Sequence, residues 1–487
     1  MGRKIPVRQL QELALQELAH NIVATVGNEV RANNGIELEV DMALLIIDVN
    51  CYLEKVGATS IIYQDLLKVI LRSDTLEASI RFSCLQMLLN ECIQNLAVET
   101  FPQSYYEKIL QVIAAQGRGL KSLDLSGVWV KIEHMHYLHE ILKNLPNLVS
   151  LIVPYIATDD LLCWIAKYNP KLRILNISGE TDITESGVEA LAFSLAKDCL
   201  TVVDIGSLGE ENIANEDISM LLMNLPNLTT LKSYSFVGRS LRYIRENENP
   251  QFTCNLRHVH DTQTSAVTME AIKNSCPKLE DLYLDTPDRG ILSKMNEMKL
   301  FKLKLYRFDC AELYPVLEKI GTNLVHVTLI KGRGTMEIGK IISSCQALID
   351  LDFYMMDLLS YSSEKCFNRL QGLEILSSPL QLWALKHFIC NTPTLKRLAI
   401  DSVQFTDEDM TRIFLEHDFN HLEDIWFTEA QNLTLATCEI LIERCPQLQS
   451  IGQLTGWRLT PDDVILLKGI LKSSNSSIAM LPANILL

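Results

Sequence analysis

The stretch LEDLYL, Leu279–Leu284, shows the pattern that decides the fold, with leucine at its first, fourth and sixth positions. The pattern returns every twenty to thirty residues, with Ile, Val or Phe in place of some leucines. Copies begin at Leu120, Leu148, Leu172, Leu200, Leu228, Leu256, Leu279, Leu300, Leu324, Leu348, Leu373, Leu395, Leu422 and Leu448. A period kept over about fourteen copies indicates a solenoid, in which each copy forms one coil.

The alternation within each copy predicts a short strand. Its leucines point into the solenoid, and the intervening side chains, such as Asp124 and Tyr283, are expected on the open face. Stacked copies then form a sheet of parallel strands. We therefore predict an α/β leucine-rich-repeat solenoid, a ribonuclease-inhibitor-like horseshoe with strands on its concave side and helices on its convex side.

A segment with helical spacing follows most of the predicted strands, as in ITESGVEALAFSLA and FTDEDMTRIFLE. In both segments a hydroxyl residue stands at the expected N-cap, with an acidic residue three positions later. The two pairs are Ser186 with Glu189 and Thr406 with Asp409. Strand, turn and helix are thus expected to alternate along the array.

The composition indicates a protein that recognises other proteins. A net charge of −16 over 487 residues argues against a general nucleic-acid binder, which needs clustered Lys and Arg for phosphate contacts. No apolar run reaches membrane-spanning length, and the start, MGRKIPVRQLQELALQ, lacks the apolar core of a secretory signal. We expect a cytoplasmic or nuclear protein that has no membrane or nucleic-acid partner.

The thirteen cysteines are scattered singly, and no two have CxxC spacing. In a reducing compartment they are expected to act as small buried hydrophobic residues. Cys276, Cys345 and Cys445 each stand three residues before a pattern leucine, which indicates a packing position between coils.

The motifs typical of catalytic or ligand-binding sites are isolated in this sequence. Gly334–Ile341, GTMEIGKI, fits the first part of a phosphate-binding loop, but Ile341 stands where Ser or Thr should hold magnesium. His134, His136 and His139 lack a neighbouring set of cysteines or carboxylates for zinc. Cys163 lies in the apolar run LLCWIA, which is expected to pack inward. The sequence therefore predicts a non-enzymatic protein with no catalytic residue, cofactor or metal.

The repeats resemble a known family from about residue 117 onward. The openings Cys276-Pro-Lys-Leu279 and Cys445-Pro-Gln-Leu448, together with the I-T-x-x-G-V-x-x-L segment from Ile183 to Leu191, look like the cysteine-containing repeats of F-box leucine-rich-repeat proteins. Such proteins typically serve as substrate receptors of cullin-RING ubiquitin ligases. The resemblance implies target binding in the ubiquitin conjugation pathway.

The first 116 residues contain no copy of the pattern and are expected to be helical. The segment LQELALQELAHNIVATV carries apolar residues at helical spacing. Its predicted apolar face consists of Leu10, Leu13, Ala14, Leu18 and Ile22. We expect a helical region over residues 1–116, followed by a repeat array with a C-terminal cap over residues 117–487.

Two parts of this helical region resemble adaptor-binding boxes. The elongin-binding box is resembled by residues at every fourth position: Leu10, Ala14 and Leu18. The cullin box is resembled by Phe101, Pro102, Tyr105 and Ile109. Together they are similar to the zyg-eleven type receptors, in which elongin-binding helices precede leucine-rich repeats. This resemblance implies that the helical region docks an elongin and a cullin.

Two alternatives stay open for the helical region. The segment from Phe101 to Leu110 also resembles the opening of an F-box, which would dock a Skp1-type adaptor. The helices would otherwise only cap the first coil, as solenoids require, and the protein would be an interaction scaffold without a ligase connection.

The concave face is the expected site of the protein substrate. Outward positions predicted to contact it are Asp124, Tyr283, Lys304, Asp352 and Trp426. Two roles stay open for the two aromatic residues. They anchor a partner, because interface hot spots favour Tyr, Trp and Arg, or each stacks on its neighbour in the next coil.

Overall fold

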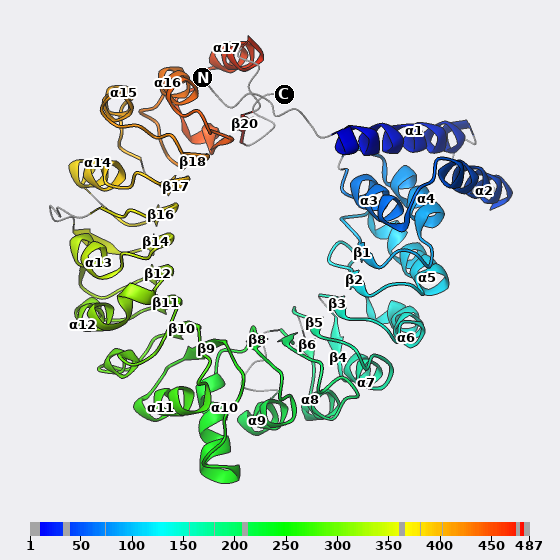
Figure 1. The fold of residues 1–487 in the computed structure, drawn as a ribbon, viewed down its shortest axis with the longest axis horizontal. Coiled ribbons are helices and arrows are strands. Elements are labelled where there is room, and N and C mark those ends of the chain that lie inside the picture. Colours follow the sequence, from blue (N-terminus) through cyan, green and yellow to red (C-terminus); the bar gives the residue numbers. More distant parts are fainter. Residues whose placement is uncertain are drawn as a thin grey trace. The chain divides into compact units, whose positions relative to one another are not determined.

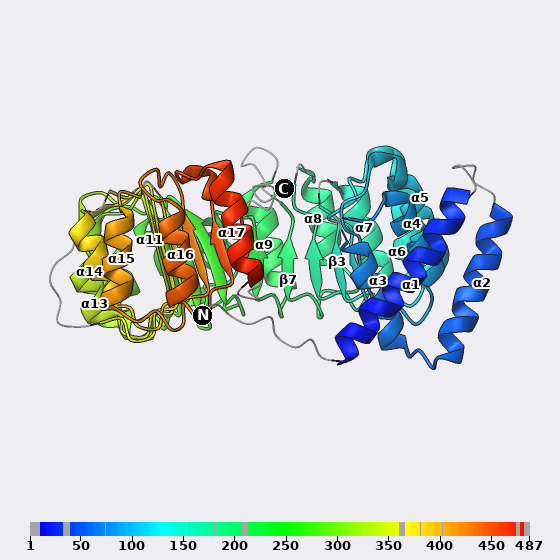
Figure 2. The ribbon, with the colours of Figure 1, turned by 90° about the horizontal axis from the view of Figure 1, so that it is seen from above.

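The computed structural model describes residues 10–32, 39–73, 75–154, 156–179, 181–206, 213–359, 366–379, 381–401, 403–473 and 478–481. These residues form two compact units, which divide between residues 256 and 257. We call them the N-terminal unit and the C-terminal unit. In each unit the strands form one layer and the helices another (Figures 1 and 2).

The N-terminal unit begins with four helices, as the sequence predicts. They are α1 (Leu10–Ala32), α2 (Glu39–Lys55), α3 (Ser60–Leu71) and α4 (Ala78–Leu88). Helix α1 packs on α3 and α4, and α2 packs on α4. The buried face of α1 runs through Ala19, Ile22 and Val26 at helical spacing. This face differs from the predicted one, because the packing side of α1 is rotated away from Leu13 and Ala14, which are exposed.

One row of six parallel strands and a separate parallel pair follow in the described part of this unit. They are β1 (Asn95–Ala97), β2 (Ser122–Asp124), β3 (Ser150–Ile152), β5 (Ile174–Asn176), β7 (Val202–Asp204) and β8 (Thr230–Lys232), and β4 (Ala157–Thr158) pairs separately with β6 (Thr181–Asp182). Strand β1 lies one coil before the first copy of the pattern, and Leu96 pairs with Leu123 of β2. Ile93 and Val98 complete the buried set of this additional coil.

Helices and short helical turns connect these strands. They are η1 (Gln103–Tyr105), α5 (Tyr106–Gln116), η2 (Ile132–His134), α6 (Met135–Asn144), α7 (Asp159–Tyr168), α8 (Glu185–Ala192), α9 (Asn215–Asn224), α10 (Val237–Tyr243) and η3 (Ile244–Glu248).

In its described residues, the C-terminal unit contains one row of ten parallel strands and a separate parallel pair. They are β9 (His258–Thr262), β10 (Asp281–Asp285), β11 (Lys302–Tyr306), β12 (His326–Ile330), β14 (Asp350–Tyr354), β16 (Gly372–Leu376), β17 (Arg397–Ile400), β18 (Asp424–Phe427), β19 (Ser450–Gly452) and β20 (Ala479–Met480). Strand β13 (Thr335–Glu337) pairs with β15 (Asp357–Leu359).

The helices of this unit cover the other layer. They are α11 (Ala266–Ser275), α12 (Cys310–Ile320), α13 (Ile338–Ser344), α14 (Leu382–Cys390), α15 (Asp407–Glu416), α16 (Leu435–Arg444) and α17 (Pro461–Ser473), with the turns η4 (Leu292–Met295), η5 (Gly321–Asn323) and η6 (Leu454–Gly456). The predicted α/β leucine-rich-repeat architecture is therefore confirmed.

The predicted frame is wrong for the copy that begins at Leu373. Strand β16 pairs Leu373 with Leu351 of β14, which is the fourth position of its copy. The first position of this coil is consequently Leu370, which is fully buried. The sequence contains leucines at both 370 and 376, three residues apart from Leu373 on either side, so the local spacing fits two frames. Burial selects the frame in which Leu370 is inside.

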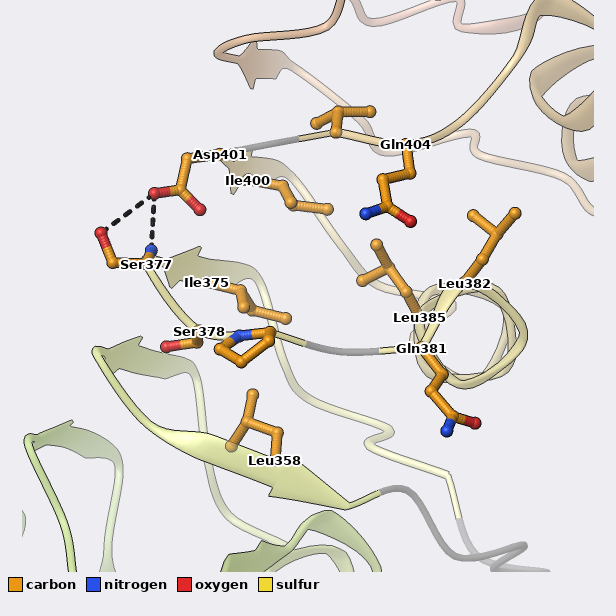
Figure 3. A pocket seen from close by; sticks show the side chains of 12 residues that line it. Leu358, Ile375, Ser377, Ser378, Gln381, Leu382, Leu385, Ile400, Asp401 and Gln404 are labelled. Atoms are coloured by element: carbon orange, nitrogen blue, oxygen red, sulfur yellow. Dashed lines mark hydrogen bonds between the residues drawn. The ribbon is translucent and has the colours of Figure 1, made fainter.

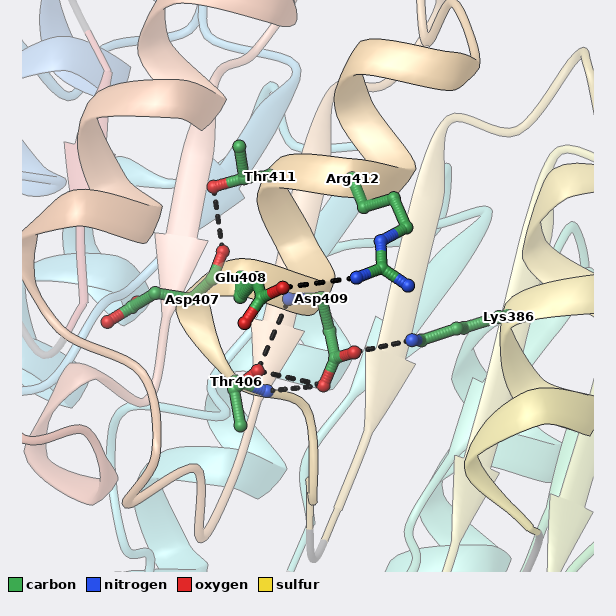
Figure 4. A network of polar contacts seen from close by, with 7 residues as sticks. All are labelled: Lys386, Thr406, Asp407, Glu408, Asp409, Thr411 and Arg412. Carbon is green, nitrogen blue, oxygen red and sulfur yellow. Dashed lines mark hydrogen bonds and ion pairs between the residues drawn. The ribbon is translucent and has the colours of Figure 1, made fainter.

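One of the two predicted helix caps is confirmed. Thr406 accepts the N–H of Asp409 (3.2 Å), and the Asp409 carboxylate accepts the N–H of Thr406 (3.0 Å) (Figure 4). The prediction for Ser186 is wrong, because α8 begins at Glu185 and its N-cap is Thr184. Thr184 accepts the N–H of Ser186 (3.3 Å), so both hydroxyl residues take part in the turn.

A residue with positive φ stands within two positions of the end of many strands. The non-glycine members are Ser233, Gln263, Thr286, Arg307, Lys331, Met355, Ser377, Glu429 and Gln453. The left-handed region costs an ordinary residue about 1–2 kcal/mol. Its recurrence shows that many coils make a sharp turn as the chain leaves the strand layer.

The cysteines divide between the interior and the surface. Cys276, Cys345 and Cys445 are buried at the predicted packing position, whereas Cys51 and Cys163 are exposed. In the described part of the chain, every helix is too short or too polar to cross a membrane.

Candidate functional site

The open side of the strands in the C-terminal unit carries two rows of side chains in register. We call this side the strand face. The outer row contains His258, Asp281, Lys302, His326, Asp350, Gly372, Arg397, Asp424 and Ser450. The central row contains His260, Tyr283, Lys304, Thr328, Asp352, Glu374, Ala399, Trp426 and Gly452. Four of the five predicted partner-contacting residues therefore lie in one row.

At its β9 end the central row forms a stack. The rings of His260 and Tyr283 lie 4.0 Å apart and are nearly parallel at 11°, and the Lys304 ammonium lies 4.3 Å from the Tyr283 ring centre. Burial lowers the pKa of His260 to about 4, so this imidazole is neutral at pH 7. The predicted residues Tyr283 and Lys304 are thus half-buried, and stacking on their neighbours fixes their positions on the strand face.

The outer row is organised by contacts between basic and acidic side chains of different strands. His258 lies 3.0 Å from Asp281, and His326 lies 2.7 Å from Asp350. Arg397 also reaches Asp350 at 2.5 Å, although the two residues stand two strands apart. Gly372 lies between them in the sheet, and a Cβ at this position would come within 2.2 Å of the Asp350 carboxylate. The missing side chain of Gly372 therefore permits the pair.

Farther along the central row, Asp352 and Trp426 have different surroundings. The Asp352 carboxylate accepts a hydrogen bond from the Thr328 hydroxyl (2.8 Å). Burial raises the pKa of Asp352 above its ordinary value, and the nearby Glu374 and Asp350 add to that rise. Trp426 is 37% exposed. Its indole lies against Gly452, where an added Cβ would come within 2.1 Å of the ring.

The predicted contact residue of the N-terminal unit, Asp124, has a local role. Its Oδ1 accepts the backbone N–H (2.9 Å) and the hydroxyl (2.5 Å) of Ser126. This side chain therefore orders the turn that follows β2, and its part in partner binding stays a prediction.

The residues resembling the cullin box lie partly in the core. Phe101 and Ile109 are buried, Tyr105 is half-buried and Pro102 is exposed. The Arg81 guanidinium stacks 4.4 Å from the Phe101 ring centre. Contact between a partner and Phe101 or Ile109 would require this part of the protein to rearrange.

The residues resembling the elongin box lie closer to the surface. Ala14 is exposed and Leu18 is half-buried, whereas the side chain of Leu10 lies outside the described residues. Leu13 beside them is 45% exposed. The helices α2 and α3 and the loop between them expose further apolar side chains: Ile47, Tyr52, Val56 and Ile61. The periodicity of α2 does not separate Ile47 and Tyr52 from the core, because this helix is apolar on more than one side. The sequence pattern did not single out Val56 or Ile61 either.

In the structure, the motifs that resemble catalytic or ligand-binding sites make ordinary structural contacts. Residues 335–337 of the loop-like motif form strand β13, and Lys340 pairs with Glu337 at 3.2 Å. His134 accepts the N–H of Lys131 through Nδ1 (3.2 Å). Within the described ranges, His, Cys, Asp and Glu side chains form no group of three or more that would hold a metal ion.

The inward packing expected for Cys163 is wrong. Leu161, Leu162 and Ile165 form the buried side of α7, and Cys163 points away from it. Its thiol pKa is raised by partial burial and by the charges of Asp159 and Asp160. The thiol is therefore protonated at neutral pH, unlike that of a nucleophilic cysteine.

A pocket lies inside the C-terminal unit between β16, β17 and α14 (Figure 3). Its walls include the buried side chains of Ile375, Leu385 and Ile400. At one edge the Asp401 carboxylate accepts the N–H (2.5 Å) and the hydroxyl (3.2 Å) of Ser377. The exposed residues Ser377, Gln381 and Gln404 line it as well, so we interpret this pocket as a hollow that is open to solvent over the core of one coil.

The comparisons with known proteins give only distant likenesses. No family model and no curated protein matches the chain. Among solved structures, the chain is similar to one in the crystal structure of the Rad7 and Elc1 complex in yeast, with 14% identity and a TM-score of 0.37, over 92% of this chain and 93% of that one. It is also similar to one in the TLR13–ssRNA13 complex, with 12% identity and a TM-score of 0.36, over 76% and 61% of the two chains. These values are too low to support a functional statement.

Proposed function

We propose that this chain is a non-enzymatic recognition protein whose strand face binds a protein partner. The supporting observation is the open central row of the C-terminal unit, which presents charged and aromatic side chains in register on parallel strands. Exposed Trp426 and the stacked pair of Tyr283 and Lys304 provide the rigid aromatic contacts that protein interfaces favour.

More specifically, we propose a substrate receptor of a cullin-RING ubiquitin ligase. The repeats resemble those of such receptors, and α1 leaves Leu13 and Ala14 exposed at the end that resembles an elongin-binding box. An exposed apolar strip on a helix is a common docking element for a groove on another protein. The alternative is an interaction scaffold in which α1–α4 only cap the first coil.

The test uses point variants, because deleting residues 1–116 would remove β1 and uncover Leu123 of β2. Tagged wild-type protein and the double variant Leu13→Asp, Ala14→Asp are purified from native cells, and the captured proteins are identified by mass spectrometry. The control is His20→Asp, an exposed position on the same helix. We expect elongins and a cullin with the wild type and the control, and neither with the double variant.

Two other results decide between the alternatives. Capture of a Skp1-type adaptor in place of elongins would favour the F-box resemblance of the segment from Phe101 to Leu110. If no adaptor is captured while other proteins are retained by the wild type and both variants, the ligase proposal fails and the scaffold remains. A strand-face variant, Trp426→Ala, should lose the target protein and keep the adaptor.

A further inference from the structure

The central row contains a gap on its β17 strand. Glu374 of β16 and Trp426 of β18 flank Ala399 of β17 in register. Because neighbouring strands lie about 4.8 Å apart, the two flanking backbones are about 10 Å apart, and only a methyl group stands between them. These three residues line one groove of the strand face together with Asp352, Arg397 and Asp424.

The indole of Trp426 is laid back to form one wall of this gap. Its position against Gly452 is possible only because that residue has no side chain. The ring thus leans on β19, away from Glu374, and 37% of the residue stays exposed. An aromatic ring beside an open gap is a favourable place for a cation.

The carboxylates that line the groove differ in whether a positive charge neutralises them. Asp350 already pairs with both Arg397 and His326. By contrast, Asp352 and Asp424 accept hydrogen bonds from the neutral hydroxyls of Thr328 (2.8 Å) and Ser450 (2.6 Å).

Glu374 is in the same situation, because its side chain is hydrogen-bonded to the hydroxyl of Tyr354. Three carboxylates therefore accept hydrogen bonds from hydroxyl groups, which do not neutralise their negative charge. The groove also includes Lys302, so its four acids exceed its two permanent cations, Lys302 and Arg397. This excess would repel a phosphate or an acidic segment and attract a basic one.

We propose that this groove binds an arginine side chain of a protein partner, with the guanidinium between Glu374 and the indole of Trp426, above Ala399. Asp352 adds a second negative charge on the neighbouring strand. A planar guanidinium needs about 3.5–4 Å to each flanking group, about 7–8 Å in all, which fits within a gap of two strand spacings, about 10 Å. Arginine fits better than lysine, because its flat cation stacks on an aromatic ring while its N–H groups reach a carboxylate.

This inference deepens the proposed recognition role and rests on it, and it is independent of any ligase adaptor. It is tested on the full-length protein labelled with 5-fluorotryptophan. The chain has five tryptophans, and the Trp426 signal is identified as the one missing from Trp426→Phe. The probes are three tripeptides, made only of arginine, only of lysine or only of glutamate, each acetylated at its N-terminus and amidated at its C-terminus. They are titrated at low salt and followed by fluorine NMR.

We expect the arginine peptide to shift the Trp426 signal saturably and the glutamate peptide to leave it unchanged. Glu374→Gln should lower the affinity for the arginine peptide by about three- to tenfold, the range for a partly exposed cation contact. Ala399→Leu should abolish the shift by filling the gap. The control Glu408→Gln, on the exposed side of α15, should bind like the wild type.

Three results would overturn the proposal: no saturable shift in the wild type, an unchanged affinity in Glu374→Gln, or equal binding of the lysine and arginine peptides. These outcomes do not depend on the captured proteins. If no adaptor is captured, a positive peptide titration still supports the arginine site. If the peptide titration fails, capture of an adaptor still supports the ligase proposal.

Discussion

Asp407 joins two neighbouring coils, and its replacement should open the junction between α15 and α16. Its Oδ1 accepts the backbone N–H of Thr434 (3.0 Å) and the hydroxyl of Thr437 (2.5 Å), and its Oδ2 accepts the hydroxyl of Thr434 (2.8 Å). The N-terminal unit uses the same arrangement, in which Asp159 accepts the N–H (2.8 Å) and the hydroxyl (2.6 Å) of Thr184. Asp407→Ala removes three bonds that cross between coils.

The expected loss follows from these bonds. A hydrogen bond to a charged acceptor contributes about 1.5–3 kcal/mol when it is buried. Because Asp407 is half-buried, water replaces part of each bond, and we expect a total of about 2 kcal/mol for the set. Neighbouring coils unfold semi-independently in a solenoid, so the loss should be local.

Hydrogen exchange followed by mass spectrometry measures this local opening. Peptides from α15 and α16 should exchange about 30-fold faster in Asp407→Ala, the factor that corresponds to 2 kcal/mol. The control is Glu408→Ala, whose exposed pair with Arg412 (3.1 Å, Figure 4) should contribute at most about 0.5 kcal/mol. Equal exchange in the two variants would refute the role of Asp407 as an inter-coil link.

The same link has a predictable pH dependence. Burial pushes the pKa of Asp407 upward, but the hydrogen bonds from Thr437 and Thr434 outweigh it and hold the pKa below its ordinary value of 3.8. A lowered folded pKa stabilises the protein above the ordinary value, and this contribution is lost as the pH falls through the folded pKa. The difference between wild type and Asp407→Ala should therefore be full at pH 6 and shrink below pH 3.8.

Four further substitutions test the fold. Leu370→Ala should lower the free energy of unfolding by about 2–5 kcal/mol, as for a fully buried leucine, whereas Leu376→Ala should lower it by less than about 1 kcal/mol. Urea unfolding of both variants decides the frame of this coil. Met355→Gly should stabilise the protein by about 0.5–1 kcal/mol, because Met355 has a φ of 52°. A rise in the urea midpoint of unfolding would confirm this, and a fall would show that the Met355 side chain contributes to packing. Gly452→Ala should displace the indole of Trp426 and cost about 1–3 kcal/mol, with a changed tryptophan emission spectrum, and an unchanged spectrum would contradict the close approach.

The spacing of leucines predicted the coils well, because the alternation of a strand is a local property that survives in the chain. It failed at Leu373, where leucines three residues apart fit two frames and only the fit against β14 decides between them. It also missed the coil of β1, where Ile93, Leu96 and Val98 take the pattern positions with only one leucine.

Helix α1 shows a second limit of the sequence. The segment LQELALQELAHNIVATV is apolar at Leu13, Leu15, Leu18 and Ile22, so its hydrophobic spacing fits more than one face. Contact with α3 and α4 buries Ala19, Ile22 and Val26 and leaves Leu13 in solvent. The candidate adaptor surface therefore depends on which side of the helix the core occupies.

The sequence by itself determined that this chain is an array of parallel strands and helices, and which residues of each strand face outward, because both follow from local periodicity. Only the tertiary structure decided which outward charges are neutralised. Arg397 reaches Asp350 across Gly372, although the two charges are separated by 47 positions in the chain. Asp352 and Glu374 meet only hydroxyls in the interactions described above. Such pairing depends on strand register and side-chain depth, which are set by packing between coils and cannot be found in any one repeat.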